Sequence, residues 1–198
     1  MTEVMKVVHT LIRTRASSRV YDPDRPVPPE MLTALLEAAR WAPSSGNGQP
    51  WRYLVFDDRV PAAREDARSC LVPDNAVWAG RAPVLLLAIA REIRAGGKTN
   101  RYAKHDLGLA NQNILLQAVA MGLCCRPMGG FNNEKAARLF RIPAGHLPMV
   151  MIALGFPGSP EDVGEAVREK EAQARTRRPV DEFAFLGAWG KCFLDNDA

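Results

Sequence analysis

The sequence has little of what metal or disulfide chemistry needs. Its 198 residues include three histidines and four cysteines. His9, His105 and His146 lie too far apart for a metal-ligand spacing, and the adjacent pair Cys124-Cys125 is not a C-x-x-C motif. We therefore expect no metal site and four reduced thiols, as in a cytosolic protein; the other two cysteines are Cys70 and Cys192.

Long apolar runs are also absent. The longest one, residues 82–90, is bounded by Arg81 and Arg91 and falls far short of the roughly 20 residues that a membrane helix needs. The apolar stretch at the N-terminus is broken by Lys6 and Arg13, which leaves no signal-peptide core. We expect a soluble, cytoplasmic protein with no membrane partner.

Several familiar site signatures are missing. Gly46-Asn47-Gly48 begins like a dinucleotide fingerprint, but Trp51 stands where the third glycine belongs. Gly96-Gly97-Lys98 is not a P-loop, because Glu92 stands in place of the first glycine. No G-x-S-x-G or H-E-x-x-H occurs, so a serine hydrolase or zinc peptidase has no signature here.

The composition is that of one globular domain. Hydrophobic residues make up 47% of the chain and no composition shift divides it, so we expect a single domain over residues 1–198, extended from about residue 161 onward. The 26 basic and 22 acidic residues give a net charge of +4. Because much of the excess lies in two clusters, a few anion contacts are favoured over a nucleic-acid face.

Helices and strands alternate irregularly, which predicts an α+β or mixed α/β fold. Helices are expected at about 3–13 and 28–41, and a charged, initially helical, solvent-facing segment at 161–178. Strands are expected at 51–56 and 84–89, both at the centre of a sheet, with a further buried strand at 149–154.

The longest helix is predicted over residues 106–121. Asp106 is the expected N-cap and Gly122 the expected stop. One face is traced by Leu109, Asn113, Leu116 and Ala120, and apolar residues occupy most of the circumference. Such a helix is buried in the core or against a second subunit.

Two arginine clusters stand near the two ends of the chain. Arg15-Ala16-Ser17-Ser18-Arg19 and Arg175-Thr176-Arg177-Arg178-Pro179 each combine planar cations with hydroxyl or small side chains. Guanidinium forks match phosphate oxygens, so a phosphorylated ligand is the simplest common explanation. The alternative for Arg15, Ser17 and Arg19 taken alone is a solvated helix terminus.

Two further segments have short or absent side chains. Pro43-Ser44-Ser45-Gly46-Asn47 offers hydroxyl, amide and backbone groups that suit a polar planar heterocycle, although a plain helix-to-strand connection would also explain it. Met128-Gly129-Gly130 lets backbone approach a ligand closely, because glycine has no Cβ.

Taken together, these motifs resemble the FMN-dependent nitroreductase family from about Thr14 to Phe183. In order they are R-x-S-x-R, A-P-S-S-x-N-x-Q-P-W, H-D-L-G-x-A-x-Q-N, M-G-G-F, G-F-P-G and R-x-R-R-P. The second motif, which begins at Ala42, is the most specific. The resemblance implies an α+β fold with a central, mainly antiparallel sheet flanked by helices, in an intertwined homodimer with a C-terminal extension and two FMN sites at the interface.

The resemblance also implies roles for individual residues. Arg15, Ser17 and Arg177 would bind the FMN phosphate, with Arg175 a weaker candidate and Arg19 reaching the phosphate or the pyrimidine edge. The residues that the partner subunit would supply to line the flavin ring and ribityl chain are Pro43, Ser44, Ser45 and Asn47. Backbone N–H groups of Met128, Gly129 and Gly130 would lie near flavin N5 and O4, and Ala16 and Gln49 complete the cofactor-binding set.

The function that follows is transfer of a hydride from NADH or NADPH through FMN to a small oxidised acceptor such as a nitroaromatic or a quinone. The cofactor carries this chemistry, so no side chain is assigned as catalytic. The alternatives are a dehalogenating, dehydrogenating or flavin-consuming enzyme on the same scaffold, or a flavin-binding protein without turnover. Nucleic-acid binding rests on the pI alone and ranks last.

Overall fold

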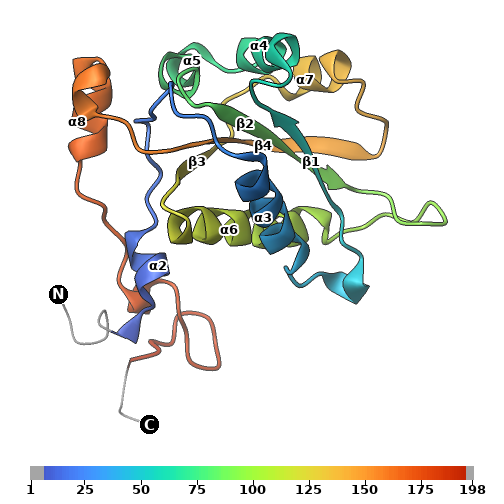
Figure 1. Cartoon of the computed structure of the whole chain (residues 1–198). Helices are drawn as coiled ribbons and strands as arrows, with labels where there is room; N and C mark the ends of the chain where they lie inside the picture. The colour runs from blue at the N-terminus through green and yellow to red at the C-terminus, as the bar shows by residue number, and fades with distance from the viewer. Residues whose placement is uncertain (1–6, 195–198) are drawn as a thin grey trace.

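A four-stranded sheet forms the centre of the protein. The structure is a computed structural model that describes residues 7–194. The strand order is β1 (Trp51–Phe56), β2 (Val84–Arg91), β4 (His146–Gly155) and β3 (Cys124–Met128), and every neighbouring pair is antiparallel (Figure 1). The expected α+β fold with an antiparallel sheet is confirmed.

The sheet is buried on both faces, and its side chains alternate between two cores. Leu86 and Ala88 of β2 point into a cluster with helices α3 (Pro29–Arg40) and α6 (Ala103–Ala120). Their neighbours on the same strand belong to a second cluster on the opposite face. Because successive strand residues face opposite sides, a continuous apolar strand such as β2 serves both cores at once.

The second face is covered by short helices. These are α4 (Pro61–Ser69), α5 (Pro73–Ala79) and α7 (Asn133–Leu139), which lie together above the sheet in Figure 1. Helix α8 (Glu165–Ala172) joins them through Val167, which is buried in the same cluster. This segment is charged and initially helical, as the sequence predicts, but it is anchored on one side.

β1 lies at an edge of the sheet, so the expectation that both 51–56 and 84–89 occupy its centre is wrong for the first. β1 is paired with β2 only, and its middle residues are partly exposed. Its β-branched and aromatic residues indicate that one face of the strand is well packed. Both edge strands and central strands can have such a face. β2 is the central strand that its continuous burial predicts.

Two boundaries differ from expectation. Helix α6 begins three residues before Asp106, at Ala103, so Asp106 is not the N-cap; its carboxylate instead accepts a hydrogen bond from the backbone N–H of Ser45. The helix ends before Gly122, whose φ of 73° confirms the predicted stop. β4 starts at His146, before the expected residue 149, and its pairing with β2 has a register irregularity next to Pro148, which has no N–H to donate.

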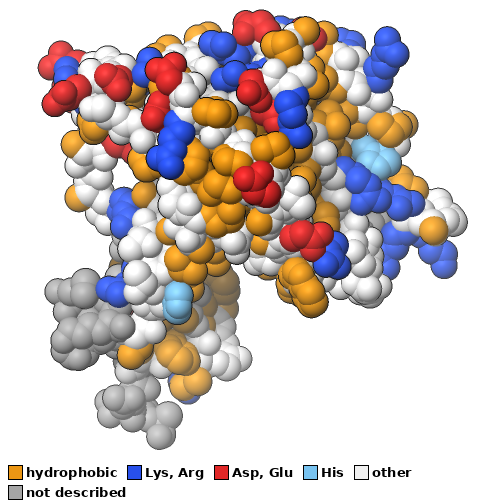
Figure 2. Space-filling model, viewed as in Figure 1, with side chains coloured by type: hydrophobic (Ala, Val, Ile, Leu, Met, Phe, Trp, Pro, Cys, Tyr) orange, Lys and Arg blue, Asp and Glu red, His pale blue; other side chains and the backbone are white. Residues whose placement is uncertain are grey.

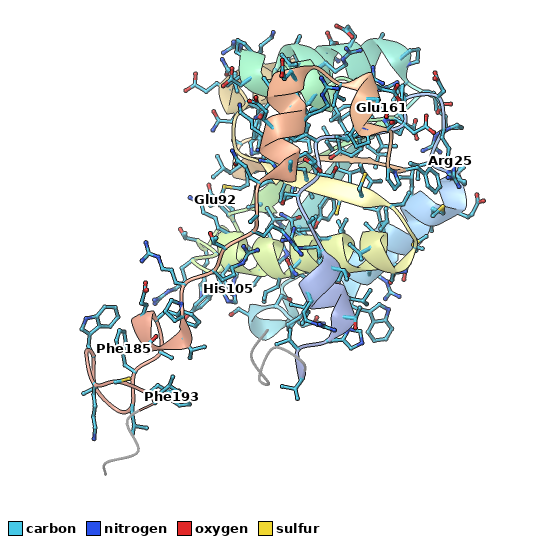
Figure 3. The ribbon with its side chains drawn as sticks, turned by 90° about the vertical axis from the view of Figure 1, so that its left-hand side faces the viewer. Arg25, Glu92, His105, Glu161, Phe185 and Phe193 are labelled. Atoms are coloured by element: carbon cyan, nitrogen blue, oxygen red, sulfur yellow. The ribbon has the colours of Figure 1, made fainter. Side chains whose placement is uncertain are left out.

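The remaining elements are short. They are α2 (Thr10–Thr14) and the short 3-10 turns η1 (Ser45–Asn47), η2 (Pro160–Asp162) and η3 (Val180–Glu182). The continuous helix expected at 3–13 is wrong, because residues 8 and 9 are not helical and α2 begins at Thr10 with His9 as its N-cap; residues 1–6 lie outside the described range. The C-terminal segment projects from the body and carries Phe185 and Phe193 (Figure 3). Among residues 7–194, no helix is both long and apolar enough to cross a membrane.

Candidate functional site

The two arginine clusters converge on one hollow, although they are about 160 positions apart in the sequence. The hollow has a volume of about 290 Å³. Every residue predicted as a phosphate ligand lines it, and so does Ala16 of the predicted cofactor-binding set; these residues are Arg15, Ala16, Ser17, Arg19, Arg175 and Arg177. Arg126, Lys170 and Glu171 complete its charged lining. We call all the residues named in these two lists the arginine clamp.

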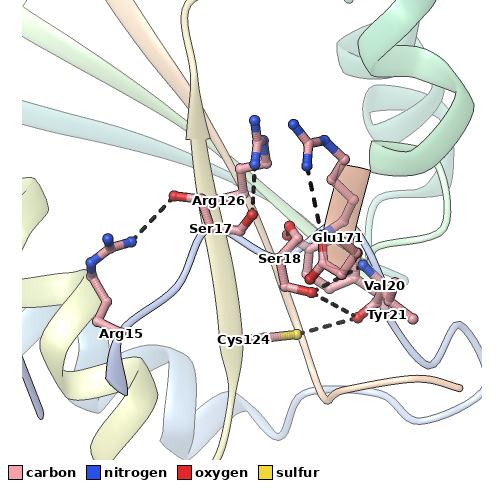
Figure 4. A network of polar contacts seen from close by, with 9 residues as sticks. Arg15, Ser17, Ser18, Val20, Tyr21, Cys124, Arg126 and Glu171 are labelled. Carbon is pink, nitrogen blue, oxygen red and sulfur yellow. Dashed lines mark hydrogen bonds and ion pairs between the residues drawn. The ribbon is translucent and has the colours of Figure 1, made fainter. Parts of the chain in front are cut away.

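Hydrogen bonds fix the N-terminal wall of the clamp. Arg15 Nη1 donates to Ser17 Oγ at 3.2 Å, which aligns the cation with the hydroxyl. Ser17 forms a parallel bridge with Cys125 on β3, and its carbonyl accepts a hydrogen bond from Arg126 Nη1 at 2.6 Å (Figure 4). The wall is therefore held against the sheet, which gives its donors a defined position.

Arg175 joins the C-terminal wall to the N-terminal one. Its Nη1 donates to the carbonyl of Arg15 at 2.8 Å, and its Nη2 donates to the carbonyl of Arg13 at 2.9 Å. Both terminal nitrogens of Arg175 are thus engaged by the backbone, and Arg175 positions the clamp. Among the contacts within residues 7–194, Arg177 on the same exposed segment makes a local bond to the Thr176 carbonyl.

The clamp has a large excess of positive charge. Six cations face one carboxylate, that of Glu171, which accepts from the backbone N–H of Arg19 at 3.0 Å and lies 3.9 Å from its guanidinium. Burial, together with the charge of Arg19, lowers the pKa of Arg126. Glu171 acts in the opposite direction but does not cancel this effect, so the positive charge of the hollow favours an anion.

Arg126 and Lys170 are members of the clamp that sequence reasoning missed. Arg126 carries a usable signal, because it is the one charged residue within the otherwise uncharged strand β3. Lys170 carries none, since it lies in a helix where charged residues are frequent.

A second hollow of about 280 Å³ adjoins the clamp and shares Arg19, Arg126 and Lys170 with it. It lies between α5 and α8, and its other lining residues are Asp74, Asn75, Val77, Trp78, Ala166 and Val167. The guanidinium of Arg126 lies 5.3 Å from the centre of the Trp78 ring. The two adjoining hollows thus differ in character: the clamp is charged, and the second hollow is partly apolar.

The Met128–Gly130 segment lies beside this second hollow. The carbonyl of Gly130 accepts hydrogen bonds from the backbone N–H of Val72 at 3.1 Å and from Asn75 Nδ2 at 3.0 Å. A Cβ on Gly130 would lie 2.5 Å from that Asn75 nitrogen, whereas a Cβ on Gly129 would meet no described atom within 4 Å. Met128 is buried in the core. Gly129 therefore borders open space, while its neighbours are fixed.

The 43–49 loop lies elsewhere, at the N-terminal end of α6, whereas the clamp lies beside β3, which follows the C-terminal end of α6 (Figure 1). Within one chain, the structure thus does not bring this loop to the clamp. The members kept apart are Pro43, Ser44, Ser45, Asn47 and Gln49.

The loop has an unusual backbone. Positive φ angles occur at Gly46 (58°), Asn47 (52°) and Gln49 (42°). Internal bonds hold it: Gln49 N–H donates to Ser44 Oγ at 3.1 Å, and Gln49 Nε2 donates to Asn47 Oδ1 at 3.1 Å. Non-glycine residues adopt such angles only when their surroundings compensate for the cost, so the loop is more constrained than an ordinary connection.

The cysteine pair beneath the clamp is a packing feature. Burial raises the pKa of Cys124 to about 12 and that of Cys125 to about 11. Cys125 is fully buried, as expected for a small hydrophobic residue.

Known proteins resemble this chain over most of its length. The model of the Nitroreductase family matches residues 12–156. A solved structure of an oxidoreductase containing FMN superposes with a TM-score of 0.86 and 30% identity, covering 93% of each chain. Protein DrgA of Synechocystis is 32% identical, covering 73% of this chain and 81% of its own length. An NADH dehydrogenase of Thermus thermophilus is 30% identical, covering 72% and 83%. With the family match spanning well over half of its residues, the chain belongs to the nitroreductase family of oxidoreductases.

Proposed function

We propose that this chain is an FMN-dependent enzyme that takes a hydride from NADH or NADPH and passes electrons to a small oxidised acceptor in the cytoplasm. The observation that carries the proposal is the arginine clamp, in which cations from both ends of the chain line one hollow. Family membership supports it, as does the likeness to an oxidoreductase containing FMN.

The residues present fit the cofactor. A phosphate monoester is an anion of charge close to −2, and it would compensate the crowded charges of Arg15, Arg126 and Arg177. The adjoining hollow, lined by Trp78 and Asn75, suits a planar, polar ring system. The absence of a dinucleotide fingerprint agrees with a mononucleotide.

Each part of the site has a distinct task in this proposal. Arg15, Ser17 and Arg177 hold the phosphate, and Arg19, which borders both hollows, reaches the pyrimidine edge. The backbone of Gly129 borders open space, so its N–H can lie close to the reactive edge of the ring. FMN, when bound, supplies the hydride-accepting chemistry, while the chain orients it and stabilises the charge that develops.

A homodimer completes the site in this proposal. The 43–49 loop is remote from the clamp of its own chain, so a second copy would bring the loop of one chain to the clamp of the other. Two surfaces are available for this contact. Leu109 and Leu116 on α6 are only partly buried, and Phe183 and Trp189 of the C-terminal segment are 64% and 92% exposed.

Nitroaromatics and quinones are the proposed acceptors. Donor and acceptor would use the same cavity over the ring in turn, so the kinetics would be ping-pong. Helices α4 and α5, which together span most of residues 61–79, are the segment expected to cover the ring.

The test is to purify the full chain, identify the released flavin and measure NADH and NADPH consumption with a quinone. We expect a yellow protein that releases FMN and turns over. Arg177→Ala should weaken FMN binding by roughly 10- to 150-fold, the equivalent of one charge-assisted contact. Arg178→Ala is the matched control, because Arg178 does not line the hollow and pairs with Glu182 at the surface.

Two results would contradict the proposal. A colourless protein that takes up no added FMN would remove the cofactor assignment. A yellow protein without NAD(P)H consumption would leave flavin binding in place but exclude the enzyme.

A further inference from the structure

A third hollow, of about 340 Å³, lies next to the 43–49 loop, at the far end of α6 from the clamp. It is lined by Gly46, Gly48, Pro50, Arg91, Ile93, Arg94, Ala95 and Asn100. Its lining comes from the loop and from the connection between β2 and α6. Neither the clamp nor the second hollow shares a residue with it.

The connection that forms one wall is strongly basic. Five of the residues from 91 to 104 are Lys or Arg, against one acid, Glu92. Lys104 neutralises that acid through an ion pair of 3.4 Å. Within the described part of the chain, Arg91 and Arg94 form no ion pair with a carboxylate. Basic side chains gather at this edge of the molecule in Figure 2.

Neutral partners hold Arg94 in place. Its Nη2 donates to Ser45 Oγ at 3.3 Å and to Asn100 Oδ1 at 3.1 Å. These acceptors carry no charge, so they position the guanidinium but do not neutralise it. Its other N–H groups stay available for a ligand in the hollow.

Asn100 adds a buried polar group to the same wall. It is only 5% exposed, and its Oδ1 accepts from Arg94 and from the backbone N–H of Tyr102 at 3.4 Å. With its oxygen engaged, the amide nitrogen is the part of the side chain that can donate to a ligand. On the opposite wall, Gly46 and Gly48 have no side chain to fill the space.

We propose that this hollow binds the 2′-phosphate of NADPH, so that the enzyme prefers NADPH to NADH. Two unneutralised guanidiniums match a phosphate dianion, whereas NADH has only a hydroxyl at that position. The inference rests on the proposed function. In that proposal Ser45, which lies beside the hollow, reaches the flavin of the partner subunit, and this contact is what places the hollow next to the substrate cavity.

The test compares two double variants. The first carries both Arg91→Gln and Arg94→Gln, and the control carries both Lys98→Gln and Arg101→Gln. Both pairs remove two charges from the same connection, but Lys98 and Arg101 do not line the hollow. We expect the ratio of KM for NADPH to KM for NADH to rise about tenfold or more in the first pair and to stay near the parent value in the second.

Direct binding separates this inference from the proposed function. The full chain as purified should bind 2′,5′-ADP more tightly than 5′-AMP, and the Arg91/Arg94 variant should lose that difference. The same result in a protein that shows no turnover would support the phosphate site while contradicting the enzyme. Turnover in a parent that does not distinguish 2′,5′-ADP from 5′-AMP would overturn the phosphate site alone.

A third experiment tests the alternative that the hollow binds an acidic electron acceptor and not the 2′-phosphate of NADPH. A carboxylated nitroaromatic is compared with an uncharged one at saturating NADPH. If the Arg91/Arg94 variant raises KM for the carboxylated compound and leaves the NADPH to NADH ratio unchanged, the assignment to the donor is wrong. Charge-preserving Arg91→Lys with Arg94→Lys should recover part of the NADPH preference.

Discussion

The arginine clamp and the 43–49 loop are both candidates for contact with one flavin, yet they differ in how they are built. The clamp has walls from both ends of the chain, joined through Arg175 and backed by β3. The loop is held by its own bonds, by Asp106 and Arg94, and by Arg52 of β1, whose Nη1 donates to the Gln49 carbonyl at 3.1 Å. In the proposed site, a single chain would therefore supply the phosphate end, and a second copy would supply the loop at the other end.

Mixing two defective variants tests this difference most strongly. One variant carries Arg15→Ala with Arg177→Ala, and the other carries Ser45→Ala with Asn47→Ala. Each alone should lose most of its FMN, because each damages every site in its homodimer. Co-expressed with different tags, they should recover flavin in about a quarter of all sites, since half of the dimers are mixed and each mixed dimer has one intact site.

The control for the mixing experiment is co-expression of two differently tagged copies of the clamp variant, which should stay colourless. A colourless mixture of the two different variants would place the loop and the clamp of one chain in the same site. A monomeric parent that carries full flavin would lead to the same conclusion.

Substitutions at the adjacent glycines Gly129 and Gly130 should have the next largest effects. Gly129→Val should slow flavin reduction by NADPH by about 10²-fold while the melting temperature barely changes, because the new side chain meets only the space assigned to the ring. Gly130→Ala should lower the melting temperature, since its Cβ would collide with Asn75. Stopped-flow reduction and thermal unfolding measure the two effects.

A histidine variant serves as the control for Gly129→Val. His105 is exposed and contacts Asp106 at 3.0 Å, so His105→Ala should stay within a few-fold of the parent. Loss of reduction in His105→Ala together with normal reduction in Gly129→Val would show that a side-chain proton donor is needed.

The sequence predicts those parts of the molecule that depend on local pattern. Continuous apolar residues marked β2, and Gly122 marked the end of α6, because both signals act within a few residues. The edge position of β1 was not predictable, since strand order depends on contacts between distant segments. Asp106 was misassigned as a cap for the same reason, because its partner Ser45 is 61 positions away.

The site shows the same division. The clamp was predictable in its two arginine clusters, where residue type and spacing are distinctive, and the structure brings the six cofactor-binding candidates from these clusters to one hollow. Lys170 could not be predicted as part of the clamp, because nothing in the sequence distinguishes it from the other charged residues of its helix. Asn75 could not be predicted either, since its relevance comes from a hydrogen bond to Gly130, 55 positions away.

The smallest expected effect concerns how firmly the clamp rests on the sheet. Cys124 and Cys125 lie beneath it on β3, with Cys125 bridged to Ser17. Burial raises the pKa of Cys124 to about 12 and that of Cys125 to about 11, so the folded state holds both thiol protons more tightly than the unfolded chain does. The stability that these thiols contribute is complete below the ordinary cysteine pKa of about 8.5 and is lost as the pH rises toward 11 to 12.

At pH 8, a thiol reagent should therefore modify the native protein at the partly exposed Cys192 of the C-terminal segment and reach the buried Cys125 only after denaturation. Mass spectrometry of the labelled peptides gives the order. Cys125→Ala should lower the melting temperature slightly and change FMN affinity little, because it leaves a small cavity under a wall that Arg126 and Arg175 still hold. If Cys125 reacts as quickly as Cys192, the wall opens in the native state, and the clamp is no more rigid than the 43–49 loop.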